Sequence, residues 1–236
     1  MKKLLIVSGC SWTDINYKSD HYPDMDCSWP KWHEILAKEL DVELISLGKV
    51  GAGQEYIFTS IIDYVCNMSD EDKKRIYMII PAWTTAARRD FQIENKWHTI
   101  RWDDRGDAYY HVRRSLRYFY QFQIFCERYN FAYKQIAMLN ILNMGDAAAS
   151  NQLPAHYHYG SGSINLSNLQ SALSSSPLYN KINGDNFIGW PIITNLGGFC
   201  IDRKVLEFKK HKISNSDRHP NQLGQQKIAE YIHENL

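Results

Sequence analysis

The sequence predicts a three-layer α/β/α sandwich with a flavodoxin-like, mostly parallel sheet, formed by residues 1–236 as a single domain. Two observations predict it. Four short apolar runs, at 4–7, 43–47, 76–80 and 133–139, alternate with segments of helical periodicity. This order is typical of βαβ units, whose parallel sheet is covered by helices on both faces. A chain of 236 residues is also long enough to bury one sizeable core.

Each apolar run has the composition of a strand that is buried on both faces. LLIV at 4–7 ends at Gly9, and ELISL at 43–47 leads into the glycine-rich turn GKVGAG. IYMII at 76–80 and YKQIAML at 133–139 are predicted as the third and fourth strands. Unbroken apolar runs of this length suit parallel strands, which have no solvent-facing side.

Four segments are predicted to form helices. The first opens at 28–30, Ser-Trp-Pro, because proline is favoured in the first helical turn. An aromatic-rich helix covers about 108–129. Three of the helices, including the first, carry apolar side chains at helical spacing, namely Trp32, Ile35, Leu36 and Leu40; Ile57, Ile61, Ile62 and Val65; and Ile228, Ile232 and Leu236.

Two segments interrupt this alternation. Residues 143–200 are rich in Ser, Asn and Gly, and residues 88–107 form a more charged insertion. A run this long without periodicity is unusual inside a compact domain. We therefore expect loop-rich insertions near the active rim of the sheet, the longer one either a functional loop or partly disordered.

The composition argues against several classes of protein. A net charge of +1 gives no general attraction to nucleic acid or to an anionic membrane surface. Five scattered cysteines without a CxxC pair argue against a disulfide framework and a zinc site. No run approaches ~18 apolar residues, and the one after Lys3 is too short for a signal peptide. We expect a soluble, cytoplasmic protein.

Polar residues follow the predicted strands at the places where ligands bind. The carboxyl ends of parallel strands meet at one rim of the sheet, and ligands of α/β proteins sit there. Ser11 follows the first strand, Gly51 follows the second, and Thr84 follows the third. Asp217 and His219 reach the same rim from the connection before the last helix.

These residue types suit nucleophilic catalysis. Ser11 needs a base within hydrogen-bond reach before its hydroxyl can attack an ester. His219 can accept that proton, because the unperturbed pKa of histidine is ~6.5. Asp217 would fix the imidazole tautomer and stabilise the imidazolium ion. Since the two residues are only two positions apart, a turn of the kind that Pro220 favours must fold the carboxylate back onto the ring.

Four short blocks make the chain resemble the SGNH, or GDSL-type, hydrolase family. Gly9-Cys10-Ser11 matches the first block, the run at 46–51 (SLGKVG) matches the second, and Asp217-Arg-His-Pro before a helix matches the last most closely. The third block departs, because Ala82-Trp83-Thr84 stands where the family has Gly-x-Asn. Cys10 also replaces the usual Asp. Some phage-encoded, uncharacterised members of the family look similar.

The resemblance implies a serine esterase without a cofactor, acting on a small-molecule or carbohydrate ester, for example an O-acetyl group. It implies Ser11 as nucleophile, His219 as general base and then acid, and Asp217 as the orienting carboxylate. The backbone amides of Ser11 and Gly51, with the Thr84 hydroxyl, would form the oxyanion hole. We expect the remaining binding residues to be those that flank these positions, namely Trp12, Trp83 and Arg88.

Other interpretations remain open from sequence. The same cleft could bind a glycan or a protein without catalysis, or transfer an acyl group to a sugar hydroxyl instead of water. Cys10 could rival Ser11 as nucleophile, although neighbouring residues that leave a strand point opposite ways, so a buried Cys10 is favoured. The glycines at 48–53 read GxxGxG after the second strand, which is a poor dinucleotide motif. His156 and His158 lack further metal ligands at a suitable spacing.

Overall fold

The computed structural model describes residues 1–100, 108–142, 170–171 and 173–236. Its central sheet has five strands in the order β2-β1-β3-β6-β7, and every pairing is parallel. The strands are β1 (Leu4–Gly9), β2 (Glu43–Ser46), β3 (Ile76–Trp83), β6 (Gln135–Ala137) and β7 (Phe187–Ile188). This is the flavodoxin-like strand order, so the predicted fold class is confirmed.

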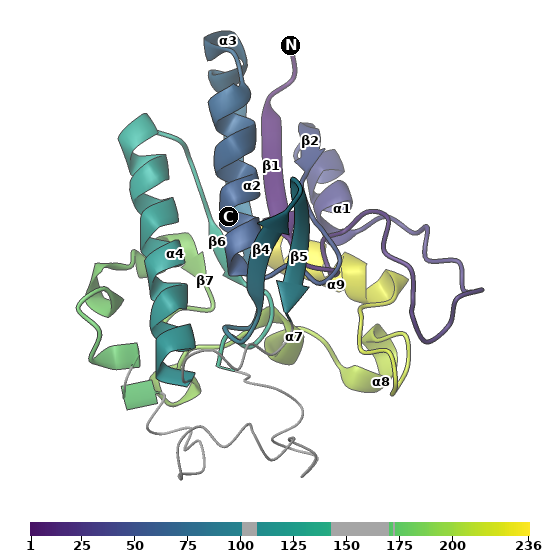
Figure 1. The fold of residues 1–236 in the computed structure, drawn as a ribbon. Coiled ribbons are helices and arrows are strands. Elements are labelled where there is room, and N and C mark those ends of the chain that lie inside the picture. Colours follow the sequence, from purple (N-terminus) through teal and green to yellow (C-terminus); the bar gives the residue numbers. More distant parts are fainter. Residues whose placement is uncertain (101–107, 143–169, 172) are drawn as a thin grey trace.

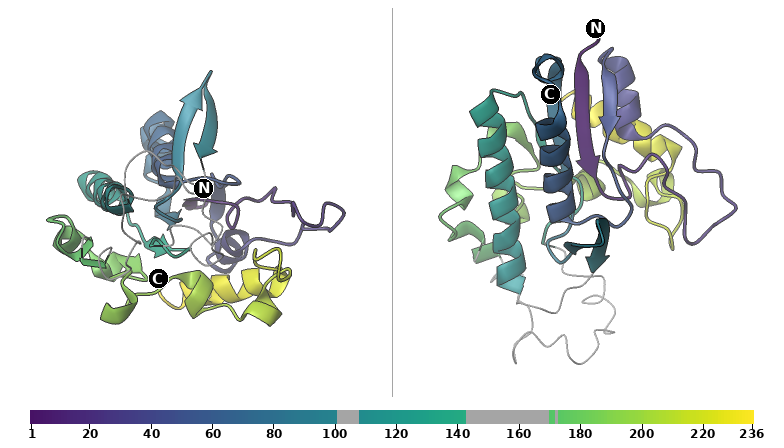
Figure 2. Two further views of the ribbon diagram at one scale, coloured as in Figure 1. Left: turned by 60° about the horizontal axis from the view of Figure 1, so that its bottom comes forward. Right: turned by 45° about the horizontal axis from the view of Figure 1, so that its top comes forward.

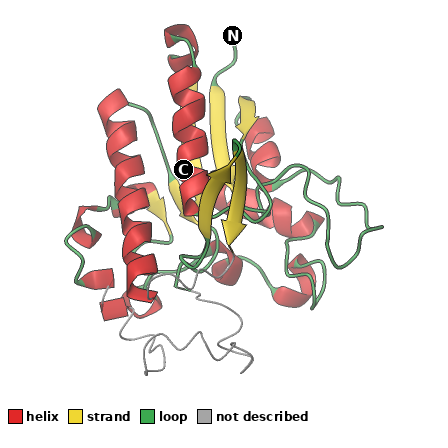
Figure 3. Ribbon diagram, in the orientation of Figure 1, coloured by secondary structure: helices red, strands yellow, loops and turns green. Residues whose placement is uncertain are grey.

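Helices cover both faces of the sheet (Figures 1 and 2). One face carries α2 (Gln54–Asn67) and α4 (Ala108–Tyr129), and the other carries α1 (Trp32–Glu39) and α9 (Gln222–His233). Short helical segments α3 (Asp70–Lys73), α7 (Ile201–Lys204) and α8 (Phe208–His211) lie in the connections. Figure 3 shows this arrangement by type of element.

The first helix begins later than its sequence predicts. Lys31 is its N-cap, and the Glu34 carboxylate accepts a hydrogen bond of 2.8 Å from the Lys31 backbone N–H. The side chain of Gln225, from α9, accepts another from the backbone N–H of Trp32 at 2.9 Å. Pro30 therefore lies before the helix, because these capping contacts start it at Trp32.

The insertion at 88–107 begins as a β-hairpin, which corrects the prediction that it is loop-rich. Strands β4 (Arg89–Ile93) and β5 (Lys96–Ile100) pair antiparallel in a sheet of their own. Glu94 and Asn95 join them with positive φ angles of 50° and 61°, as a two-residue hairpin turn requires. The buried Asp90 carboxylate fastens the hairpin to α2 by accepting hydrogen bonds from the N–H groups of Gly53 and Tyr56, each at 2.8 Å.

The described part of the insertion at 143–200 supplies the fifth strand of the sheet, which the sequence did not predict. The segment contains β7 and the 3₁₀ turns Tyr179–Lys181, Gly184–Asn186 and Thr194–Leu196. A two-residue strand carries no detectable periodicity, which explains the omission. Residues 143–169 and 172 of this insertion, which include His156 and His158, lie outside the described residues. Among the described helices, none is long and apolar enough to cross a membrane.

Candidate active site

The turn after β1 presents Ser11 at the carboxyl edge of the sheet. The turn is closed by a hydrogen bond from the Thr13 N–H to the Cys10 carbonyl, 2.8 Å long. The side chain of Cys10 is fully buried in the core, whereas Ser11 lines a cavity. The burial expected of Cys10 is therefore confirmed.

The glycine-rich turn after β2 packs against this Ser11 turn. The Lys49 N–H donates to the Gly9 carbonyl at 3.0 Å. A Cβ atom at Gly48 would lie 2.3 Å from the carbonyl oxygen of Thr13, so only glycine allows the two turns to approach so closely. Gly51 has a φ of 77°, a left-handed conformation that also favours glycine.

A second loop, before α9, folds Asp217 back onto His219. The backbone pairs across this loop, with Ile213 N–H donating to the His219 carbonyl and Ser214 N–H to the Asp217 carbonyl, both at 2.9 Å. Asp217 Oδ1 then accepts from the backbone N–H of His219 at 3.0 Å and lies 2.6 Å from its Nδ1. The carboxylate thus folds back through a local turn of the kind that Asp favours.

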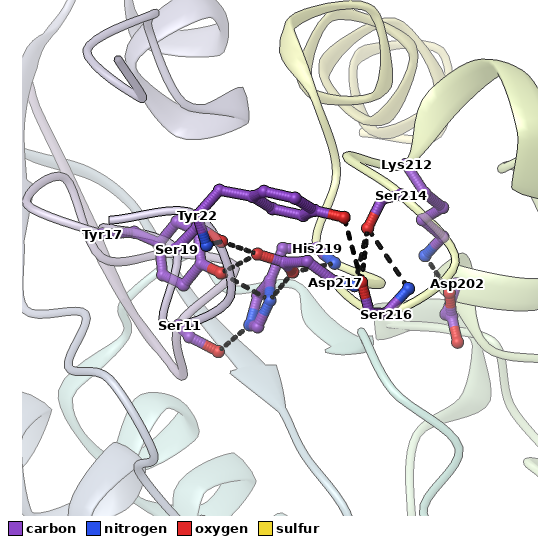
Figure 4. Close-up of polar contacts among 10 residues, drawn as sticks. All are labelled: Ser11, Tyr17, Ser19, Tyr22, Asp202, Lys212, Ser214, Ser216, Asp217 and His219. Carbon is purple, nitrogen blue, oxygen red and sulfur yellow. Dashed lines mark hydrogen bonds and ion pairs between the residues drawn. The ribbon is translucent and has the colours of Figure 1, made fainter. Parts of the chain in front are cut away.

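Ser11, His219 and Asp217 form one chain of hydrogen bonds (Figure 4). Ser11 Oγ lies 2.7 Å from His219 Nε2, although the two residues are 208 positions apart in sequence. An ionised Asp217 carboxylate accepts hydrogen bonds but cannot donate one. The neutral imidazole of His219 therefore carries its proton on Nδ1, which faces this carboxylate. Nε2 is then left as the acceptor for the hydroxyl proton of Ser11.

Two further residues hold Asp217 from its other side. Tyr17 donates its hydroxyl to Asp217 Oδ2 at 2.8 Å, and Ser19 donates to the same oxygen at 2.5 Å. The Tyr17 oxygen also lies 2.8 Å from His219 Nδ1, and its ring lies 4.2 Å from the imidazole ring, centroid to centroid. Neither residue is predictable from the sequence, because nothing in a polar loop marks them as neighbours of a residue some 200 positions away.

These contacts shift the pKa values of the site in opposite ways. Burial alone would raise the pKa of Asp217, but hydrogen bonds from Ser19, His219 and Tyr17 outweigh it and lower this pKa to about 2. Burial lowers the pKa of His219, and the cations Arg88 and Lys212 add to that effect against the opposing Asp217 carboxylate. Both shifts favour an ionised aspartate beside a neutral histidine, the protonation state that a general base needs.

Ser11 and His219 open into a cavity of about 700 Å³. Trp12 and Arg88, which we expected to bind substrate, also line it. The ring of Trp12 is the more enclosed of the two, and the Lys212 ammonium lies 3.9 Å from its centroid. Lys212 is itself buried and forms an ion pair with Asp202 (Figure 4).

Three residues expected at the site do not line the cavity. Trp83 is fully buried in the core, where its ring lies 5.0 Å from that of Phe119, so a substrate-binding role for Trp83 is wrong. Thr84 is also fully buried, and its hydroxyl cannot reach the cavity from that position. Its neighbour Thr85 lines the cavity instead, and Gly51 does not.

Thr85 is a third residue of the site, after Tyr17 and Ser19, that was not predicted from the sequence. The Thr85 hydroxyl has no hydrogen-bond partner among the described residues. The same holds for the backbone N–H groups of Ser11 and Gly51. Side-chain alternation could not have indicated Thr85, because Trp83, two positions earlier, points into the core. Within the described ranges, no cluster of three or more His, Cys, Asp or Glu could hold a metal ion.

Comparison with solved structures gives a similarity that covers the whole chain. The chain superposes with a TM-score of 0.51 on the structure of a proposed lipolytic protein of the G-D-S-L family from Desulfitobacterium hafniense DCB-2, at 9% identity and over 100% of both chains. No protein-family model and no curated protein matches the sequence. The similarity and the strand order together show that this chain has an SGNH/GDSL-like α/β/α fold.

Proposed function

We propose that this protein is a serine hydrolase that cleaves an ester bond through Ser11, His219 and Asp217. One observation carries the proposal: Ser11 Oγ is 2.7 Å from His219 Nε2, and His219 Nδ1 is 2.6 Å from Asp217. The three side chains come from opposite ends of the sequence, and a chance meeting in this order is a poor explanation for the arrangement.

In the proposed reaction, the Ser11 oxygen attacks the carbonyl carbon of the ester while its proton passes to His219 Nε2. The imidazolium ion that forms is stabilised by the ionised Asp217. It then donates the proton to the departing alcohol oxygen, which leaves an acyl group on Ser11. His219 next takes a proton from water, the hydroxide oxygen attacks the acyl carbon, and the proton returns to Ser11 as the acid is released.

The negative oxygen of the tetrahedral intermediate needs hydrogen-bond donors. We assign the Ser11 backbone N–H and the Thr85 hydroxyl to this role in place of Thr84. Both donors belong to residues that line the cavity, and neither group has a partner among the described residues. The Thr85 hydroxyl is a weaker donor than the side-chain amide of the Asn that the family has near this position. The loss of one oxyanion donor, however, lowers the rate only by a factor of about 10²–10³.

Labelling with a fluorophosphonate tests the proposal directly. We expect wild-type protein to be modified at Ser11, as mapped by mass spectrometry, and Ser11→Ala and His219→Ala to remain unmodified. Ser8→Ala is the matched control, since Ser8 is buried and bonded to Ser60 at 2.8 Å. A folded wild-type protein that is not modified would show that the site lacks an activated nucleophile and acts in binding only.

A further inference from the structure

Arg88 places a partly buried positive charge in the cavity beside the Ser11–His219 pair. Among the described residues its guanidinium makes one hydrogen bond, from Nη1 to the Ala52 carbonyl at 2.9 Å. No carboxylate pairs with Arg88 among the described residues. A guanidinium has five N–H donors, so most of those of Arg88 are available to a ligand.

The loop that carries Arg88 is held firmly by α4. The side chain of Arg114 donates from Nη2 to the carbonyls of Ala86 and Arg88, at 3.1 and 2.5 Å. The Ala86 N–H donates in turn to the carbonyl of Ile141 at 3.0 Å. Arg88 is therefore presented on a fixed backbone, which reduces the entropy that a ligand must overcome on binding.

The other charges that are enclosed in the cavity are already engaged. Lys212 pairs with Asp202, and Asp217 is held by His219 and its two hydroxyl partners. The other charged residues that line it, Asp20, Arg203 and Arg218, are exposed to solvent, where their fields are screened. Arg88 is thus the enclosed cation of the cavity lined by Ser11 and His219 that has no counter-ion among the described residues.

We propose that Arg88 binds an anionic group of the substrate, a carboxylate or a phosphate, so that the site selects esters that carry a negative charge close to the scissile bond. This inference rests on the proposed function. Arginine suits such a group because its planar fork can donate two parallel hydrogen bonds to one anion. A neutral ester would leave the Arg88 charge partly desolvated and unpaired, which is costly.

The test measures inhibition by small anions, which does not depend on which side of the ester carries the charge. Hydrolysis of 4-nitrophenyl acetate is followed with succinate, phosphate or the neutral succinamide, at constant ionic strength. The variants are Arg88→Gln and, as matched control, Arg89→Gln, which removes the neighbouring arginine that does not line the cavity. We expect competitive inhibition by an anion and none by succinamide. Arg88→Gln should raise the inhibition constant about tenfold or more, whereas Arg89→Gln should keep it.

Each outcome decides the inference. Inhibition by succinate alone assigns a carboxylate, and inhibition by phosphate alone assigns a phosphate. If wild type hydrolyses the ester but neither anion inhibits it, or if Arg88→Gln is inhibited equally, the inference is overturned while the proposed function stands. If a folded wild-type protein neither hydrolyses the ester nor reacts with the fluorophosphonate, the proposed function fails. Calorimetric titration with both anions then tests Arg88 alone, and binding that Arg88→Gln retains would refute its role.

Discussion

Replacing Tyr17 by phenylalanine should separate the positioning of the triad from its chemistry. The variant removes one oxygen atom and keeps the ring that lies 4.2 Å from the imidazole of His219. Asp217 loses the donor at 2.8 Å but keeps Ser19 Oγ and both N–H groups of His219. The hydroxyl does not touch the reacting atoms directly, so any loss of rate must arise through Asp217 and His219.

The size of the effect follows from the bond that is lost. A hydrogen bond to a charged group contributes about 1.5–3 kcal/mol, and three remaining donors compensate in part, so we expect a loss of about 1–2 kcal/mol of stability. For a domain of this size that lowers Tm by roughly 3–6 °C. If the whole loss is also felt in the transition state, kcat/KM falls about 5- to 30-fold.

The pH dependence of kcat/KM gives the more specific readout. With fewer donors sharing its charge, Asp217 stabilises the imidazolium ion more strongly, and the pKa of His219 rises. The acid limb of the profile should therefore move to higher pH, which a purely structural defect would not cause. Tyr22→Phe is the control, because its hydroxyl bonds to the exposed Ser216 at 3.1 Å and, among the described residues, to no member of the triad. A Tyr17→Phe profile that coincides with those of wild type and Tyr22→Phe would refute this role.

Three further predictions concern the residues around the triad. Thr85→Val should lower kcat/KM of the ester reaction by a factor of up to about 10²–10³. Thr84→Val should keep kcat/KM and unfold at the same or a higher temperature, because the Thr84 hydroxyl is buried without a described partner. Equal losses of kcat/KM in both variants would contradict the assignment. Trp83→Phe should cost about 2 kcal/mol of stability in denaturant titrations without raising KM, since its indole N–H donates to a buried glutamine in the core. Because its pKa is lowered from 3.8 to about 2, Asp217 stabilises the fold by about 2 kcal/mol above pH ~4, and this contribution is lost as the pH falls towards 2; urea titrations of wild type should show that loss, and those of Asp217→Asn should not.

Much of the fold was predictable because it depends on local patterns. The strand at 4–7 and the helix after Gly53 are each indicated by the pattern of apolar side chains within a short stretch of sequence. Because those side chains must be buried, few other secondary structures suit these segments. The helix at 108–129 was predicted with its observed limits. The two-residue β7 and the hairpin in the charged insertion were missed, because a strand that short has no period and the hairpin is held by Asp90 against a distant helix.

The sequence alone determined which residues could provide a nucleophile, a base and a carboxylate, since Ser11 follows a predicted strand and the Asp217–His219 pair precedes a predicted helix. Only the tertiary structure decided their distances and the residues that hold them. Tyr17 and Ser19 meet Asp217 across some 200 positions, through folding of a polar loop without any periodic signal. The sequence also could not decide that Thr85 lines the cavity and Thr84 does not. The direction of a side chain at the end of a strand depends on how the backbone turns against its neighbours.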